Sequence, residues 1–211
     1  GIQKNKAPSL EMKRNLIHGY AACVSYVDQQ VGEVIAAIDD LGLRDDTVVI
    51  LMSDHGYSLS EHNRWAKHSL FEIELQVPLL INIPQISEGK ITDSFAELVD
   101  IFPTLCDVLQ IPKPSHLQGN SLINAMNTPH EIHKNYAVAR WKSGETLITE
   151  QYSYSEWQNK NGKITGRMLY DLQNDPGETI NVSQNVEYSK LVDSLSNRIS
   201  AMSSQYKTIQ Q

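Results

Sequence analysis

Residues 47–56 read TVVILMSDHG, and this stretch decides the fold. Its apolar part is continuous and largely β-branched, without alternation of apolar and polar side chains. Such a run is typical of a strand buried on both faces, in a parallel sheet covered by helices. We therefore predict an α/β fold with this strand in its sheet. Because ligands of open α/β sheets bind beyond the carboxyl ends of the strands, Asp54 and His55 are candidate site residues.

The elements around this strand fit the same fold class. Apolar side chains recur at helical spacing over residues 11–41, and Gly42 follows them, which predicts one long amphipathic helix. After a polar loop, the apolar residues 77–84 predict a second strand with prolines near its ends. Residues 95–109 predict a helix that Pro103 should kink.

The pattern changes beyond a proline-containing connection that ends near residue 130. Short strand candidates then alternate with turn residues, and a helix follows them. The predicted strands cover 136–141, 145–152 and 167–172, the hairpin tip 160–163 and the final helix 188–202. We therefore predict the end of an α/β domain over residues 1–130, and a small α+β subdomain with an antiparallel sheet and a helix over residues 131–211.

The composition is that of an ordinary globular protein, with 211 residues, 40% hydrophobic and 20% charged. The formal net charge is −7, so no basic field exists to attract nucleic acid, and we expect no nucleic-acid partner. No stretch approaches the roughly 18 uninterrupted apolar residues of a transmembrane helix, so we expect no membrane span.

Asp54 and His55 combine a carboxylate with an imidazole, two groups that bind divalent cations. An isolated Asp-His pair more often caps a turn on the surface, but the position at a strand end favours a metal site. Calcium prefers oxygen ligands, so the pair by itself is equally compatible with zinc or manganese.

The loop after this pair, residues 57–68, concentrates further polar side chains: His62, Arg64, Lys67 and His68. Cationic donors beside a metal carboxylate suit an anionic substrate, because their charge-assisted hydrogen bonds to phosphate or sulfate are strong. A lysine ammonium, with its rotatable donors, suits a tetrahedral oxyanion. A solvated polar loop explains the composition equally well.

A longer stretch makes the assignment specific. Residues 48–81, VVILMSDHGYSLSEHNRWAKHSLFEIELQVPLLI, closely resemble the corresponding part of the iduronate-2-sulfatase group of sulfatases, in the alkaline-phosphatase superfamily. Residues 19–47 look like the helix that leads into it in those enzymes, and residues 167–182, RMLYDLQNDPGETINV, are similar to a segment of the sulfatase C-terminal subdomain. The resemblance implies the C-terminal part of a sulfatase-type α/β sandwich domain, followed by the small antiparallel-sheet-and-helix subdomain.

The same resemblance implies roles for the site residues. Asp54 and His55 would bind one Ca²⁺, and Lys67 would contact the substrate sulfate. His62 would donate a proton to the leaving alcohol, and His68 would contact the substrate. The implied substrate is a sulfated carbohydrate, namely a sulfated uronic acid or a related glycan residue.

A polar-aromatic cluster in the predicted subdomain contains Arg140, Trp141 and Lys142. Aromatic faces and cations are the groups that a sulfated sugar needs. Strands also favour aromatic residues for packing, so packing explains the cluster as well as substrate contact does. Arg140 is the member that we predict to bind substrate.

The nucleophile of this sulfatase type is missing from the sequence. These enzymes convert a cysteine in a Cys-x-Pro/Ala-x-Arg context to formylglycine, and neither Cys23 nor Cys106 has that context. Both cysteines are predicted to be buried small hydrophobic side chains. We expect the N-terminal portion of the same sulfatase to be the partner that supplies formylglycine and further calcium ligands, and this chain alone to be inactive. Related enzymes are periplasmic, secreted or lysosomal.

Two other functions stay open. An Asp-His-Gly sequence after a buried strand also occurs in metal-dependent phosphoesterases and phosphomutases of the same superfamily, which usually bind two transition metals. A protein that kept the fold and lost the nucleophile would instead be a non-catalytic carbohydrate-binding remnant.

Overall fold

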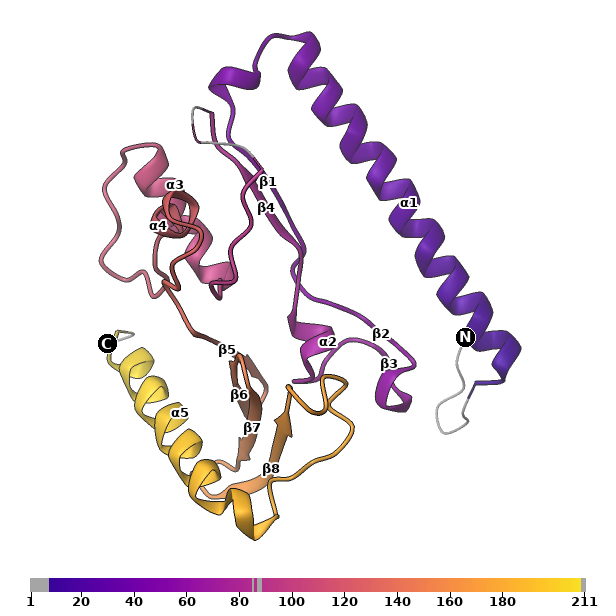
Figure 1. Ribbon diagram of the computed structural model, residues 1–211, viewed down its shortest axis with the longest axis vertical. Helices are drawn as coiled ribbons and strands as arrows, with labels where there is room; N and C mark the ends of the chain where they lie inside the picture. The colour runs from indigo at the N-terminus through magenta and orange to yellow at the C-terminus, as the bar shows by residue number, and fades with distance from the viewer. Residues whose placement is uncertain (1–7, 85, 87–88, 210–211) are drawn as a thin grey trace. The chain divides into compact units, whose positions relative to one another are not determined.

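The computed structural model describes residues 8–84, 86 and 89–209 (Figure 1). They form two compact units, the first from residues of 1–67 and 76–85 and the second from residues of 68–75 and 86–211. Every buried hydrophobic side chain among the described residues belongs to the second unit. The predicted domain boundary near residue 130 falls inside the second unit and stays a prediction.

The first unit begins with α1 (Leu10–Asp40), which confirms the predicted long helix (Figure 1). The Ser9 hydroxyl caps it by accepting a hydrogen bond from the Met12 N–H at 3.2 Å, and Gly42 ends it at φ +66°. None of its residues is buried. Its exposed apolar side chains include Leu16, Ile17, Tyr20, Val24, Val27 and Val34. Within the described part of the chain, neither α1 nor any other helix is long and apolar enough to cross a membrane.

The first unit also contains both strands predicted from the apolar runs, β1 (Val49–Met52) and β4 (Leu79–Asn82). They pair antiparallel, with Met52 opposite Leu79, so the expected parallel pairing is wrong for these described strands. They are not buried on both faces either, because Met52 is 51% exposed and Leu80 58% exposed. A short continuous apolar run indicates a strand that favours burial, but it carries no information on strand direction.

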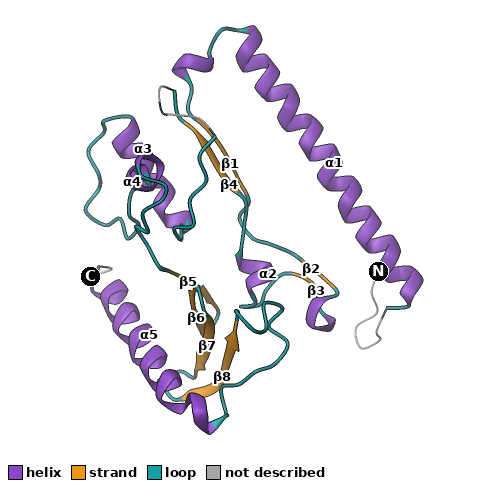
Figure 2. Cartoon of the chain, viewed as in Figure 1, coloured by secondary structure: helices purple, strands orange, loops and turns teal. Residues whose placement is uncertain are grey.

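The second unit contains a four-stranded antiparallel sheet in the order β5-β6-β7-β8 (Figure 2). The helix α5 (Ser189–Ile209) packs on it, which confirms the predicted sheet-and-helix subdomain. The predicted hairpin tip at residues 160–163 joins the last two strands, as expected. The strands are β5 (Tyr136–Trp141), β6 (Gly144–Thr149), β7 (Tyr152–Gln158) and β8 (Ile164–Asp171).

The sequence prediction missed β7 as a separate strand. The stretch 145–152 was expected to be one strand, but the chain turns at residues 150–151 and the next strand starts at Tyr152. This turn consists of Glu150 and Gln151, and neither residue is one of the usual turn formers. No turn signal therefore marked the end of β6 in the sequence.

Side-chain alternation gives this sheet two different faces. On one face Leu147, Tyr154 and Leu169 are cross-strand neighbours, and they pack against α5. The Tyr154 hydroxyl donates to the buried Glu156 carboxylate at 2.8 Å, and burial raises the pKa of Tyr154 to about 12. Its phenol therefore stays neutral in the core over the ordinary pH range.

Two short helices precede the sheet, α3 (Ile101–Val108) and α4 (Ile123–Asn127). The predicted helix 95–109 starts later than expected, because Leu98–Asp100 forms the 3-10 turn η3. Pro103 therefore lies in the first turn of α3, where no N–H is needed, and the expected kink inside a longer helix does not arise. Cys106 is buried as predicted, whereas Cys23 is exposed on α1, so that part of the prediction is wrong.

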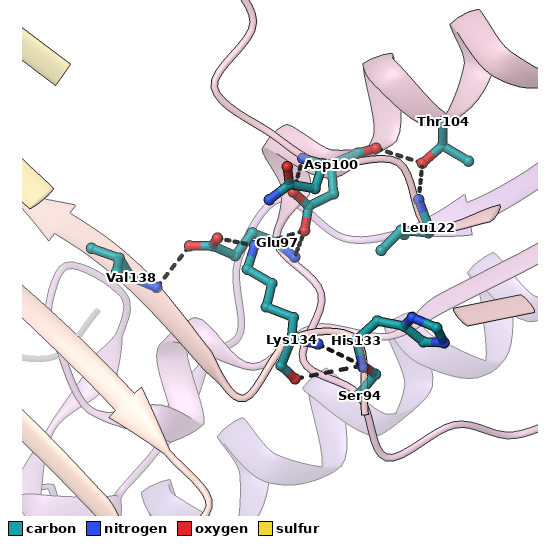
Figure 3. A network of polar contacts seen from close by, with 9 residues as sticks. Ser94, Glu97, Asp100, Thr104, Leu122, His133, Lys134 and Val138 are labelled. Carbon is teal, nitrogen blue, oxygen red and sulfur yellow. Dashed lines mark hydrogen bonds and ion pairs between the residues drawn. The ribbon is translucent and has the colours of Figure 1, made fainter. Parts of the chain in front are cut away.

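A buried ion network joins η3 to the start of β5 (Figure 3). The Asp100 side chain is 0% exposed, and it accepts hydrogen bonds from the Lys134 ammonium at 2.9 Å and the Asn120 N–H at 2.8 Å. Glu97 pairs with the same ammonium and accepts the Val138 N–H at 2.7 Å. Burial lowers the pKa of Lys134, but the two carboxylates outweigh burial and raise the pKa overall.

We predict that Lys134→Ala lowers the free energy of unfolding by about 3 kcal/mol, because it leaves the buried Asp100 carboxylate without its cation. Urea unfolding measures this change. Since the pKa of Lys134 is raised by folding, the stabilisation is fully present below the ordinary lysine pKa and is lost as the pH rises through the folded-state value.

The matched control is Lys113→Ala, which breaks the exposed pair with Asp107 and should cost less than about 1 kcal/mol. If both variants lost the same free energy of unfolding, the buried network would not stabilise the fold more than an exposed ion pair does.

Candidate functional site

The candidate site begins where β1 ends. The Ser53 hydroxyl donates to the His55 carbonyl at 2.8 Å, which shapes the turn out of the strand. The His55 Nδ1 lies 2.7 Å from the Gly56 carbonyl oxygen, which only accepts hydrogen bonds, so Nδ1 carries the proton. Nε2 therefore presents a lone pair. The Asp54 side chain is 83% exposed, and its Oδ1 lies 3.6 Å from the same Nε2.

A small hairpin brings Lys67 back to this pair. It consists of β2 (Ser58–Leu59) and β3 (Trp65–Ala66), with Ser58 opposite Ala66. Lys67 follows directly, and its ammonium donates to the His55 Nε2 at 2.5 Å. The fold thus brings together three predicted site residues, Asp54, His55 and Lys67.

The hairpin and the residue after it are built with unusual backbone angles. Ser60, His62, Asn63, Ala66 and His68 all have positive φ, between +52° and +107°. Non-glycine residues adopt this region at a cost, and such residues cluster at functional sites. His62 lies at the hairpin tip, on the 3-10 turn η2 (Glu61–Asn63). Its predicted role as a proton donor stays a prediction.

The donor set at Asp54 and His55 fits part of a metal site. A metal-binding imidazole commonly donates its other ring N–H to a backbone carbonyl, as His55 does to Gly56. Two side chains do not complete a coordination shell. Over residues 8–84, 86 and 89–209, no group of three or more His, Cys, Asp or Glu side chains is arranged to hold a metal ion. The pair fits two ligands of a cation whose other ligands come from elsewhere.

The two predicted substrate contacts of the second unit lie on opposite faces of the sheet. The His68 ring contacts the Trp141 ring, with centroids 4.5 Å apart. Arg140 points to the other face, because it precedes Trp141 on β5, and there it pairs with Glu145. Ser203 of α5 donates to the same carboxylate at 2.6 Å. The structure therefore separates Arg140 from His68, and both substrate roles stay predictions.

Residues 68–75 pack on the sheet face opposite α5. Leu70 is buried beside Gly144, and the Phe71 and Tyr170 ring centroids lie 6.0 Å apart. The segment ends in the short helix α2 (Glu72–Leu75), whose Glu72 N–H donates to the Glu178 carboxylate at 2.7 Å.

The sequence prediction gave Glu178 no role. The Asp-Pro-Gly-Glu sequence at 175–178 is a turn signal, but the residue that this turn would contact is not visible in the sequence.

Residues 2–111, more than half of the 211-residue chain, match the family described as sulfatase. The chain belongs to the sulfatase family. Residues 60–205 match a second family, described as the C-terminal part of N-sulphoglucosamine sulphohydrolase. The family implied by the resemblance is confirmed.

Known sulfatases are similar to most of this chain. Arylsulfatase K of Homo sapiens is 31% identical over 202 residues, which cover 90% of this chain and 37% of that protein. Iduronate 2-sulfatase of Mus musculus is 34% identical over 129 residues, which cover 49% of this chain and 23% of that protein. The chain thus spans about a third or less of the length of these relatives.

Two solved structures share the architecture of this sulfatase chain. A protein in complex with its substrate D-glucosamine-2-N,6-O-disulfate superimposes with a TM-score of 0.80 at 25% identity, over 88% of this chain and 40% of that one. The phosphonate monoester hydrolase of Agrobacterium radiobacter superimposes with a TM-score of 0.77 at 26% identity, over 87% of this chain and 40% of that one.

We predict that Gly144→Ala loosens residues 68–75 and destabilises the chain by about 1–3 kcal/mol. An added Cβ would lie 2.4 Å from the Trp157 Nε1 and 2.9 Å from the Leu70 Cδ1, so one of these packed side chains must move. Thermal unfolding followed by circular dichroism measures the loss.

The control is Gly19→Ala on α1, where nothing lies within 4 Å of the added atom and helix propensity favours alanine. If Gly144→Ala proved as stable as Gly19→Ala, the described packing of Leu70 on the sheet would be contradicted.

Proposed function

We propose that this chain is the C-terminal portion of a sulfatase that hydrolyses sulfate esters of a sulfated uronic acid or a related glycan residue. In this proposal it supplies two metal ligands and the sulfate-binding lysine. The convergence of Asp54, His55 and Lys67 at the end of β1 carries the proposal. A carboxylate, an imidazole and an ammonium within this short reach suit an anionic ester beside a cation.

Lys67 is the proposed contact for the sulfate group. Its ammonium has three donors, and one of them is directed at His55. The others are available to sulfate oxygens, where charge-assisted hydrogen bonds neutralise negative charge as the ester bond breaks. His62 at the hairpin tip is the proposed proton donor to the leaving alcohol, a role that imidazoles fill more often than any other side chain.

Asp54 and His55 are the residues that would hold a Ca²⁺ ion, together with ligands from the rest of the protein. When bound, such an ion supplies Lewis-acid polarisation of the sulfate group. The hydrogen bond from the His55 Nδ1–H to Gly56 fixes the tautomer whose Nε2 carries the lone pair. Lys67 donates to that lone pair in this structure, so an ion at Nε2 would take the place of this hydrogen bond.

The proposed substrate class is supported by the relatives. One is named for iduronate 2-sulfate chemistry, and one solved neighbour holds a sulfated glucosamine as its substrate. In this chain, His68 and Trp141 offer an aromatic pair with the Lys142 ammonium 5.6 Å from the indole centroid. Sugars bind to aromatic faces with cations nearby to pair with their acidic groups. Arg140 is retained as a second proposed contact, although Glu145 already pairs with it.

The proposed partner is the N-terminal portion of the same sulfatase, which would bring the formylglycine nucleophile and the missing calcium ligands. The extent of the relatives beyond the matched part supports this, since 63% of arylsulfatase K lies outside the match (100 − 37). The exposed apolar face of α1 also supports it, because soluble proteins rarely leave such a face uncovered.

The decisive experiment uses an enzyme assembled from this chain and the nucleophile-bearing N-terminal region of a sulfatase. It should hydrolyse a uronic acid 2-sulfate and not the matching phosphate ester. Chelation should abolish turnover, and Ca²⁺ should restore it. Lys67→Ala should lower kcat/KM about 100-fold or more, because one charged donor to the reacting group is lost.

Arg140→Ala in the same assay decides whether that residue binds substrate, since a contact raises KM and an unchanged KM removes the residue from the site. Glu150→Ala in the exposed β6–β7 turn serves as the control variant.

The alternative function is that of a phosphoesterase, and the similarity to a phosphonate monoester hydrolase is the reason to test it. Two bound zinc or manganese ions, together with hydrolysis of phosphate or phosphonate esters and of no sulfate ester, would refute the sulfatase proposal in its favour.

The isolated 211-residue chain should hydrolyse no aryl or sugar sulfate. Its affinity for the N-terminal region should fall about tenfold or more in Val27→Asp, because a charge replaces an apolar contact on α1. Isothermal titration measures the affinity. Gln29→Ala on the same helix is the control. Turnover by the chain alone would refute the assignment of the nucleophile to the partner region.

A further inference from the structure

A single buried carboxylate fixes the segment that directly follows Lys67. Glu178 is 3% exposed, and one of its oxygens accepts the N–H of Glu72 at 2.7 Å, across 106 residues of sequence. A carboxylate at the first N–H of a helix satisfies a donor that has no partner inside the helix. Glu178 is therefore the long-range hydrogen-bond anchor of α2 within the second unit.

The turn that carries Glu178 is rigid. The Glu178 N–H donates to the Asp175 carbonyl at 3.0 Å, and the Asp175 carboxylate accepts the Ile180 N–H at 2.7 Å and the Thr179 hydroxyl at 2.8 Å. Glu178 itself has φ +51°, an uncommon backbone conformation for glutamate. A strained residue of this kind persists only where its surroundings hold it in place.

Other contacts within the segment do not replace this anchor. Glu74 accepts the Ser69 N–H at 2.7 Å, which closes the segment on itself. Leu70 and Phe71 supply apolar packing against the sheet, but such contacts are non-directional. The bond from Glu72 to Glu178 is directional, and it ties the backbone of the segment to a turn 106 residues away. Burial raises the pKa of Glu178, which means that the charged form of this carboxylate is costly here. The neutral form still has an oxygen that can accept the Glu72 N–H.

The segment reaches the proposed site through the chain itself. Lys67 and His68 are consecutive, and Ser69 begins the anchored stretch. Lys67 bonds to His55 in the first unit, while His68 contacts Trp141 in the second. A residue that fixes the backbone of 69–75 therefore also restricts the position of His68, which directly precedes this stretch.

We propose that Glu178 is a positioning residue, which holds residues 69–75 on the sheet and thereby sets the placement of His68, beside Trp141, for the sulfated substrate. The inference rests on the proposed function for its catalytic consequence. Its structural consequence is independent of that function.

The test uses Glu178→Ala, which removes the acceptor, and Glu178→Gln, which keeps an acceptor without the charge. Hydrogen exchange on the 211-residue chain should show the amide of Glu72 and its neighbours in 69–75 exchanging about tenfold faster in Glu178→Ala, and near wild type in Glu178→Gln. Amides of β6 and β7 should keep their protection in both variants, which reports an intact fold.

A further variant, Glu178→Asp, keeps the proposal testable if Glu178→Ala does not fold. Glu178→Asp suits the positive φ at least as well as glutamate does, but its carboxylate is one methylene shorter and falls short of Glu72. It should behave as Glu178→Ala does. Unchanged exchange of residues 69–75 in Glu178→Asp, with β6 and β7 protected, would overturn the proposal.

The catalytic readout is the split between KM and kcat in the assembled enzyme. Glu178→Ala should raise KM for the sulfate ester about tenfold with a smaller change in kcat, and Glu178→Gln should restore KM. If the wild type cleaves no sulfate ester, the proposed function fails while the exchange result still decides the anchoring. If the hydrogen exchange of residues 69–75 changes but KM does not, the positioning role is refuted. Glu178 would then anchor the segment without an effect on catalysis.

Discussion

The four-stranded sheet of the second unit has two faces to bury, and the rest of the chain is arranged around that requirement. One face is covered by α5 through Leu147, Tyr154 and Leu169. The other is covered by residues 68–75, a segment that begins at the end of the candidate site loop. Burial of apolar surface is the dominant favourable term in folding, so the packing of Leu70 and Phe71 stabilises the second unit.

The candidate site loop has a local structure of its own within the first unit. Its hairpin is short and contains several non-glycine residues with positive φ, which are costly in isolation. The Ser53 hydroxyl shapes the turn that precedes the hairpin, and the Lys67 ammonium that follows it donates to the His55 Nε2.

The first unit, unlike the second, has no hydrophobic core among its described residues. Among its described residues no hydrophobic side chain is buried, and α1 exposes apolar side chains from Leu10 to Val34. A structure of this kind gains little stability from its own contacts. It suits a part of a larger sulfatase domain, in agreement with a match that covers about a third of arylsulfatase K. Asp54 and His55, the proposed metal ligands, also belong to this unit, and two side chains alone do not complete a coordination shell.

Local features were predictable from the sequence because their causes are local. The apolar period and Gly42 predicted α1, and β5 was predicted as a short strand candidate bounded by turn residues. Asp54 and His55 were predicted as site residues because a strand end is visible in the sequence. The turn at residues 150–151 was missed, since Glu and Gln carry no turn signal.

The sequence by itself determined the family and the main helices, and it predicted Asp54 and His55 as metal ligands. Only the tertiary structure decided that β1 and β4 run antiparallel, that Arg140 and Trp141 face opposite sides, and that Glu178 holds Glu72. The physical reason is that residue patterns report local conformational preference and the need for burial. Which distant groups then meet depends on how all the buried faces and hydrogen-bonding groups are satisfied together.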